Sequence, residues 1–251
     1  MIAFVFSGQG SQYPGMGQAL CADSQAARTV YAEAAAELGY DLLQLDEGRL
    51  AQTACVQPAI VTLSLAAWQA FLETWRDLQP AQMDRLLSSI TGLAGFSLGE
   101  YSALGAAGVL DFPSLIALIH ERARLMQEAT VATPGSMAAV IGLTDQQVLA
   151  VLDQARFRDQ VYAVNFNAPG QVVLSGHAAA MPDCLAACSR AGARRVVALD
   201  VSGAFHTPLM ARAAEKLKQF AAGLSFAPAR LRLYSNLDGQ PVESSVDWPE
   251  Y

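Results

Sequence analysis

The hydrophobic positions in the first half of the chain follow two different spacings. A short apolar run at residues 2–6 predicts one β-strand, and Ile90, Leu93 and Ala94 predict a second, buried strand just before the serine motif. Apolar positions that recur at helical spacing predict helices over residues 24–38, 58–75 and 112–129, the second of them opened by a proline. Because strands alternate with helices, this half predicts an α/β fold with a mainly parallel sheet.

The second half changes to a β-α-β-β-α-β order, which is typical of a ferredoxin-like arrangement. From about Gly135 the predicted elements are a strand over 137–141, a helix that begins at the capping box Thr144-x-x-Gln147, strands over 161–166 and 172–175, a helix over 178–191 and a strand over 195–199. We therefore expect a hydrolase-like α/β core from residues 1–130 and 200–251, with an inserted ferredoxin-like small subdomain over residues 131–199.

The sequence of residues 247–251 predicts the start of one more helix. Asp247 is followed by Trp248 and Pro249, and proline is favoured in the first turn of a helix. A helix that starts so close to Tyr251 has no body, so we expect that part of the natural protein lies beyond this residue.

Composition narrows the class of protein. The chain has 251 residues, 53% of them hydrophobic and 16% charged, which is enough to bury a large core. Its net charge of -7 and its 16 lysines and arginines, without a long basic run, argue against a nucleic-acid-binding protein.

The apolar stretches predict neither a targeting segment nor a membrane span. Residues 1–6 have no positive side chain ahead of the apolar run and are shorter than the apolar core of a secretory signal. The longest apolar stretches, such as residues 59–68, fall short of a membrane span. We therefore expect a cytoplasmic protein with no membrane partner.

Cysteine and histidine spacing predicts no metal site. The cysteines form no C-x-x-C pair and are expected to be reduced and mostly buried: Cys21, Cys55, Cys184 and Cys188. The three histidines lie far apart in the sequence and have no further ligand at zinc-binding spacing.

The motif that carries chemistry is Gly95-Phe96-Ser97-Leu98-Gly99. This G-x-S-x-G pattern follows a predicted strand and opens a helix, as in a nucleophile elbow, where glycines flank a serine on a sharp turn. It nominates Ser97 as a nucleophile. The first amides of a helix have no internal acceptor, so the N–H of Leu98 can stabilise an oxyanion. The alternative is a glycine-flanked serine in an ordinary turn.

A serine nucleophile needs a base, and three histidines compete for that role. His120 falls within a predicted helix, and His177 stands at the start of a predicted helix in the small subdomain, so structural roles are expected for both. His206 falls in a loop after a predicted strand, where catalytic residues concentrate. We therefore predict that His206 is the base.

A glycine-rich loop, Gly8-Gln9-Gly10-Ser11-Gln12, follows the first predicted strand. It is not a dinucleotide fingerprint, because Tyr13 stands where the third glycine is required. Such a loop can instead present backbone N–H groups to a ligand oxygen and so provide a second oxyanion donor. A plain turn between a strand and a helix is the alternative.

Six motifs, in order along residues 4–236, together resemble those of malonyl-CoA:acyl carrier protein transacylases and the related acyltransferase domains of polyketide synthases. They are the glycine-rich loop at 8–12, Gln57-Pro58-Ala59, the serine motif followed by Glu100, Arg122, the run Asn165-Phe166-Asn167-Ala168-Pro169-Gly170-Gln171, and Gly203-Ala204-Phe205-His206.

The resemblance implies a role for each matching residue. Ser97 would attack the malonyl thioester of coenzyme A while His206 accepts its proton, and the backbone N–H groups of Gln9 and Leu98 would hold the oxyanion. Arg122 would bind the malonyl carboxylate, for which a planar guanidinium is suited. The alternative for this arginine is a place on the helix surface, paired with Glu121 or Glu128.

Further residues of the motifs would contact the substrate. The resemblance assigns Phe205, Asn165 and Asn167 to this role. The bulky Phe205 ring beside the base is similar to the choice of malonyl-specific relatives, so we predict malonyl over methylmalonyl.

Two features depart from the family pattern. Many relatives have histidine where Phe96 stands, and phenylalanine cannot donate a hydrogen bond, so activity or acyl preference is expected to differ. In the family, a residue beyond the point where this chain stops orients the catalytic imidazole through its backbone carbonyl. We expect weakened activity without that segment.

The implied partners are malonyl-CoA and an acyl carrier protein, whose phosphopantetheine thiol accepts the acyl group. The carrier would serve fatty-acid biosynthesis, polyketide biosynthesis or malonate breakdown. No resident cofactor is implied. Carrier proteins are acidic, so a basic surface is expected, and the candidates are Arg190, Arg194, Arg195, Lys216 and Lys218, which could equally form an ordinary solvated face.

Several other functions share part of this pattern. An α/β-hydrolase would use Asp183 or Asp200 as the triad acid. Two further alternatives would form the same acyl ester on Ser97: an editing acyl hydrolase and a stand-alone, trans-acting polyketide acyltransferase. A protein that only docks carriers would need no reactive serine.

Overall fold

The computed structural model describes residues 1–10, 12–201, 203–243 and 245–251. Two compact units make up the chain. We call residues Met1–Arg124 and Leu217–Tyr251 the core unit, and residues Leu125–Lys216 the small unit. The chain leaves the core unit within helix α7 (Phe112–Ala132) and returns to it within helix α10 (Ala211–Ala221).

The core unit contains a three-stranded parallel sheet in the order β1-β2-β7. The two predicted strands are present as β1 (Ile2–Phe6) and β2 (Ile90–Gly95), which confirms the expected parallel pairing. The third strand, β7 (Leu233–Tyr234), pairs with β2 through Leu93 and Ala94. Its two residues are too few for a recognisable apolar pattern, so the sequence analysis did not predict it.

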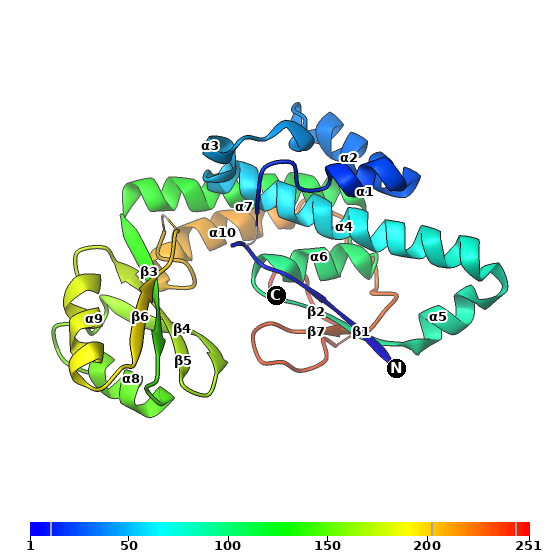
Figure 1. Ribbon diagram of the computed structural model, residues 1–251. Coiled ribbons are helices and arrows are strands. Elements are labelled where there is room, and N and C mark those ends of the chain that lie inside the picture. Colours follow the sequence, from blue (N-terminus) through cyan, green and yellow to red (C-terminus); the bar gives the residue numbers. More distant parts are fainter. Residues whose placement is uncertain (11, 202, 244) are drawn as a thin grey trace. The chain divides into compact units, whose positions relative to one another are not determined.

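Helices stack in layers on this sheet (Figure 1). Helix α6 (Leu98–Ala106) packs on β1 and β2, α4 (Thr53–Leu78) packs on α6, and α2 (Gln25–Leu38) packs on α4. The shorter helices of the core unit are α1 (Gln18–Asp23), η1 (Leu42–Gln44), α3 (Glu47–Leu50), η2 (Pro80–Gln82) and α5 (Met83–Ser89).

Helix α4 corrects the predicted role of Pro58. The sequence pattern predicts this proline at the start of the helix, but α4 begins at Thr53 and Pro58 lies inside it. A proline there removes one backbone hydrogen bond of the helix. The added first turn buries Cys55 and Val56 in the core, and this burial offsets the lost bond. It also places Gln57 inside the helix.

By length and composition alone, α4 could cross a membrane, contrary to the expectation that no stretch is long enough. In the structure, 67% of its most apolar window is buried inside the protein. Among its residues, Val56, Ala59, Ile60 and Val61 belong to the largest apolar cluster of the core unit. The helix is therefore packed as a core helix.

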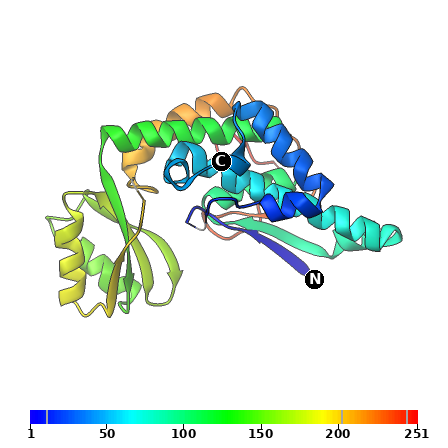
Figure 2. The same cartoon turned by 45° about the horizontal axis from the view of Figure 1, so that its top comes forward.

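The small unit contains a four-stranded antiparallel sheet in the order β4-β5-β3-β6. The strands are β3 (Gly135–Ile141), β4 (Val161–Ala168), β5 (Gln171–His177) and β6 (Arg195–Ala198). Two helices, α8 (Asp145–Leu152) and α9 (Met181–Arg190), pack against the sheet (Figure 2). The predicted capping box is confirmed, because Thr144 and Gln147 exchange hydrogen bonds at the start of α8.

Strand β3 is buried on both faces, following the two-residue alternation of a strand. Ala138 and Val140 pack in a cluster with residues of α8 and α9. Met137 and Ala139 point to the opposite face, where they form a second cluster with Phe205. The sheet thus supports the segment that carries His206.

The start of α9 differs from the prediction. The sequence pattern extended this helix from residue 178, but residues 178–180 form a turn and α9 begins at Met181. Pro182 then occupies the first turn, where its missing N–H is not needed. His177 is consequently the last residue of β5, and its backbone N–H donates to the carbonyl of Gln160 at 2.9 Å.

All four cysteines are buried and free of disulfides, as expected: Cys21, Cys55, Cys184 and Cys188.

The two glycines of the serine motif allow α6 to approach the sheet closely. A methyl group on Gly95 would overlap the backbone of Gly99 and Glu100, and one on Gly99 would overlap the carbonyl of Phe6. The glycines are therefore needed for contact between the first turn of α6 and the ends of β1 and β2.

We predict that Gly99→Ala lowers the free energy of unfolding by about 1–3 kcal/mol or more, because the added methyl meets backbone atoms that cannot rotate away. Urea denaturation measures this. Gly48→Ala is the matched control, since a methyl on this exposed helical glycine meets only the Asp46 side chain, at 3.5 Å. The control should be neutral or stabilising by up to about 1 kcal/mol. Equal destabilisation by both substitutions would contradict the packing argument.

Candidate active site

Ser97 lies at the junction of β2 and α6 in a strained backbone conformation, with φ 50° and ψ -109°. Among the described residues other than glycine, only Ser97, Asp159 and His206 have positive φ. Such conformations cost free energy and concentrate at functional sites. Both residues that the sequence predicts as nucleophile and base are among the three.

Two backbone amides next to the elbow are available to a ligand. Leu98 is the first residue of α6, and Gln9 lies in the loop after β1. Within the described parts of the chain, neither backbone N–H has a hydrogen-bond acceptor, whereas the following amides of Gly99 and Glu100 donate to the carbonyls of Phe96 and Ser97. Unpaired N–H groups of this kind can stabilise an oxyanion.

The glycine-rich loop packs directly against the elbow. The backbone N–H of Phe96 donates to the carbonyl of Phe6 at 3.1 Å. A methyl group on Gly8 would come within 2.8 Å of the carbonyl oxygen of Phe96 and 3.0 Å of its ring. The structure therefore brings Gly8, at the start of the loop that carries Gln9, beside Phe96, the residue that precedes Ser97. The ring of Phe96 is 45% exposed.

Arg122, on α7, is held by two residues of the core unit. Its guanidinium donates a hydrogen bond of 2.6 Å to Oε1 of Gln57 and lies 5.2 Å from the centre of the Tyr101 ring. Tyr101 belongs to α6, the helix that starts at the elbow. The alternative pairing with neighbouring carboxylates is not observed, since Glu121 pairs with Arg124 and Glu128 with Lys216.

The sequence did not predict the role of Gln57 in holding Arg122. The side chain of Gln57 is only 1% exposed, so it fixes the guanidinium of Arg122 from inside α4. Gln57 is the first residue of one of the six motifs, so the sequence marked it as a candidate. The motif did not indicate that Arg122 is its hydrogen-bond partner.

His206 occupies a short, tightly bonded loop of the small unit. The hydroxyl of Thr207 donates to the carbonyl of Ala204 at 2.7 Å and accepts from the N–H of Leu209 in η3 (Pro208–Met210). The flanking Phe205 and Thr207 are buried, while His206 is exposed. The buried Phe205 and Thr207 thus anchor the loop, while the imidazole of His206 between them is exposed.

Phe205 and the two asparagines also belong to the small unit. The Phe205 ring is 8% exposed and packs with Met137, Val173 and Met210. Asn165 is half-buried and Asn167 is exposed, and both lie where irregularities interrupt the pairing of β4 with β5. Such β-bulges redirect side chains and are common beside active sites.

The predicted site residues thus fall into two groups. The core unit brings together Ser97, Leu98 and the Gln9 loop, with Arg122 held by α4 and α6. The small unit carries His206, Phe205, Asn165 and Asn167. Because the proposed nucleophile and base belong to different units, their pairing stays a prediction.

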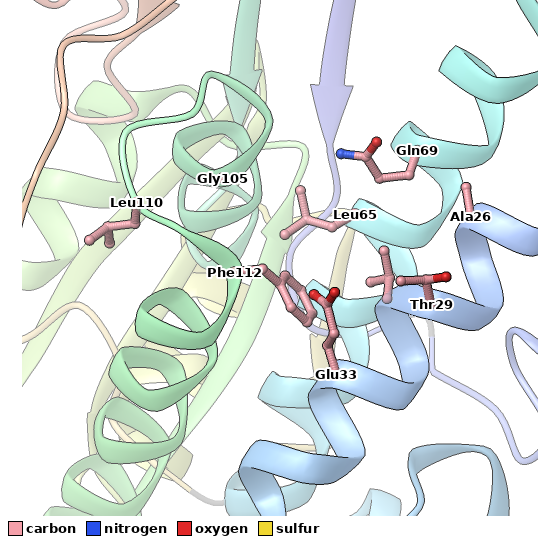
Figure 3. Close-up of a pocket in the computed structure, with 9 residues that line it drawn as sticks. Ala26, Thr29, Glu33, Leu65, Gln69, Gly105, Leu110 and Phe112 are labelled. Carbon is pink, nitrogen blue, oxygen red and sulfur yellow. The ribbon is translucent and has the colours of Figure 1, made fainter.

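A cavity of about 390 Å³ in the core unit is formed by other residues (Figure 3). It lies between α2 and α4, beside the segment that connects α6 to α7. The lining residues include Glu33, Leu65, Gln69 and Phe112, and no predicted site residue is among them.

Comparison with known proteins gives the family of the chain. The family model described as the acyl transferase domain matches residues 3–247. The chain belongs to the acyl transferase domain family. This confirms the resemblance that the six motifs predicted.

Curated relatives of this acyl transferase domain are malonyl CoA-acyl carrier protein transacylases. The protein of that name from Salmonella typhimurium is 40% identical over 240 residues, covering 94% of this chain and 74% of the relative. The one from Bacillus subtilis is 36% identical over 256 residues, covering 99% of this chain and 76% of the relative.

Solved structures with the same fold are enzymes of this kind. A type II polyketide synthase acyl carrier protein in complex with its malonyl-transacylase gives a TM-score of 0.88 at 36% identity, covering 99% of this acyl transferase domain and 78% of that chain. An acyl carrier protein S-malonyltransferase from Vibrio cholerae gives 0.85 at 38% identity, covering 99% and 78%. The α/β fold with its parallel sheet is thereby confirmed.

Proposed function

We propose that this acyl transferase domain moves a malonyl group from coenzyme A to the phosphopantetheine thiol of an acyl carrier protein, through a malonyl ester of Ser97. The relatives and solved structures described above carry names of this activity. The observation that carries the proposal is the elbow itself, where a strained serine is followed by the backbone N–H of Leu98, which has no acceptor among the described residues.

In the first half-reaction, Oγ of Ser97 attacks the thioester carbonyl and His206 takes the hydroxyl proton. The carbonyl oxygen becomes an oxyanion, stabilised by the N–H groups of Gln9 and Leu98. Collapse of this intermediate breaks the carbon–sulfur bond. Coenzyme A leaves as a thiol with the proton from His206, and the malonyl group stays on Ser97.

In the second half-reaction, the phosphopantetheine thiol of the carrier attacks the ester, and the same groups act in reverse. His206 takes the thiol proton and returns it to Oγ of Ser97 as the ester bond breaks. Atoms and charges balance over the two halves, so no resident cofactor is required.

Arg122 is proposed to bind the free carboxylate of the malonyl group. Its guanidinium keeps N–H groups beyond the single one bonded to Gln57, and a planar guanidinium can donate two parallel bonds to a carboxylate. The buried amide of Gln57 and the Tyr101 ring fix its orientation before the substrate arrives. Acyl groups without a carboxylate would lose this contact.

The small unit is proposed to supply the base and the carrier surface. Its element order and its sheet order, β4-β5-β3-β6, support a ferredoxin-like subdomain. Arg190, Arg194 and Arg195 are exposed on it and suit an acidic carrier, whereas Lys216 pairs with Glu128. One solved relative is a complex with an acyl carrier protein. We also propose that the protein acts in the cytoplasm.

Hydrolysis is not favoured as the activity. The relatives and structures reported above are named as transacylases or transferases. Asp183 and Asp200, the candidate acids of a hydrolase triad, are exposed. A guanidinium anchored in advance suits an acidic acyl group and is unnecessary for a generic ester.

We predict that Arg122→Ala lowers kcat/KM for transfer from malonyl-CoA to a carrier protein by about 10²- to 10³-fold, because a charged hydrogen-bonded contact is lost. The transfer is measured by the mass of the loaded carrier. Arg124→Ala is the matched control, since this neighbouring arginine pairs with Glu121 on the helix surface and should stay within about twofold of the parent. Equal losses in both variants would contradict the role of Arg122.

The acyl preference is tested by competition between malonyl-CoA and methylmalonyl-CoA. We predict that the parent protein uses malonyl-CoA at least about tenfold better than methylmalonyl-CoA, since one methyl group misplaced in a packed pocket costs about 1–3 kcal/mol. Phe205→Ala should lower this preference for malonyl-CoA over methylmalonyl-CoA. Equal use of both thioesters by the parent protein would refute the assignment of Phe205 as the selective ring.

A further inference from the structure

We propose that Asn236 is a positioning residue that holds the nucleophile elbow in its reactive conformation. The Asn236 side chain binds the backbone of Ser97, and the Asn236 backbone is in turn held by Glu100 of the same elbow. The inference deepens the proposed function, since it rests on Ser97 as the nucleophile.

Two hydrogen bonds form a closed ring at the elbow. The backbone N–H of Ser97 donates to Oδ1 of Asn236 at 3.0 Å. The backbone N–H of Asn236 donates to Oε1 of Glu100 at 2.8 Å. Glu100 lies in the first turn of α6, only three residues after Ser97. Both bonds therefore join Asn236 to the same short segment, residues 97–100.

The register of the parallel sheet places Asn236 at this position. Strand β7 pairs with β2, so that Leu233 lies beside Leu93 and Tyr234 beside Ala94. Within two residues of these pairs, both strands end and leave the sheet at the same edge. There β2 leads into the elbow and β7 leads into the turn that contains Asn236. Side chains at the carboxyl ends of neighbouring parallel strands meet in this way.

The turn that contains Asn236 is itself closed by hydrogen bonds. The N–H of Ser235 donates to the carbonyl of Gln240 at 2.8 Å, and the N–H of Leu237 donates to the Ser235 hydroxyl at 3.0 Å. The hydroxyl of Tyr251 adds a second bond to Oε1 of Glu100, at 2.7 Å. Asn236 is thus presented by a defined turn.

The Ser97 amide needs an acceptor from outside its own elements. The last ladder bond of β2 is made by the N–H of Phe96 to Phe6, and the helical bonds of α6 begin after Ser97. The N–H between them has no partner in either element. Asn236 supplies the acceptor at 3.0 Å and thereby favours the backbone conformation with positive φ that Ser97 adopts.

Asn236 acts through Ser97 without a direct contact to the acyl group. Its loss should therefore slow the chemical step at saturating substrate and leave KM within about twofold. Because the side chain is on an exposed residue, its removal costs little packing, and the fold should be retained.

Hydrogen exchange of the Ser97 amide, measured by NMR, tests the contact without any substrate. In Asn236→Ala this amide should exchange at least about tenfold faster than in the parent protein. Asn236→Asp keeps an acceptor oxygen of the same shape and should retain the protection. Leu237→Ala, which alters an adjacent side chain that is 90% exposed, should have no effect.

The Leu98 amide serves as an internal reference, because it lacks an acceptor and should exchange equally fast in every variant. Unchanged exchange of the Ser97 amide in Asn236→Ala would overturn the proposal. If Asn236→Ala fails to fold, Glu100→Gln gives the second test. Glu100→Gln keeps the size of the side chain and removes its charge, so Ser97 protection should fall by about threefold or more.

Single-turnover malonylation of Ser97 tests the consequence. Asn236→Ala should lower the acylation rate constant by about 10- to 100-fold with KM unchanged, while Leu237→Ala matches the parent. If the parent protein is not malonylated at all, the proposed function fails, and the exchange experiment still decides the role of Asn236. If the parent is malonylated and Asn236→Ala is equally fast, the positioning role is wrong.

Discussion

The close approach of α6 to the carboxyl ends of β1 and β2 is the constraint on which the rest of the site depends. It requires glycine at positions 95 and 99, because any β-carbon there would overlap backbone atoms. At this junction Ser97 has a positive φ, and the N–H of Leu98, the first residue of α6, has no acceptor among the described residues. Gly8, at the start of the loop that carries Gln9, packs against Phe96 at the same junction. The strained serine, the N–H of Leu98 and the start of this loop therefore meet at one place in the core unit.

Each unit holds its own candidate site residues in place by packing and hydrogen bonds. In the core unit, a buried glutamine and a tyrosine ring hold the guanidinium of Arg122. In the small unit, β3 is covered on both faces, and the second face packs Phe205 so that the adjacent His206 is exposed. In each unit, this packing would lower the conformational cost of using these side chains in the proposed acyl transfer, whose chemistry is mainly orientation and electrostatic stabilisation.

Much of the fold followed from the sequence, because its strongest signals are local. The elbow, the parallel pair of β1 and β2, the capping box at Thr144 and the element order of the small unit all rest on short patterns. Pro58 was misplaced, since burial of the turn before it overrides the local preference of proline. Asn236 and the role of Gln57 were missed because they depend on sheet register and helix packing between segments far apart in the chain.

The most direct test of the account is peptide-resolved mass spectrometry of the protein after brief exposure to malonyl-CoA without a carrier. We predict one malonyl ester, located on Ser97, that forms with release of one equivalent of coenzyme A and disappears when a carrier thiol is added. Ser97→Ala should carry no ester. A malonyl group on another residue, or transfer to the carrier by Ser97→Ala at the parent rate, would contradict the account.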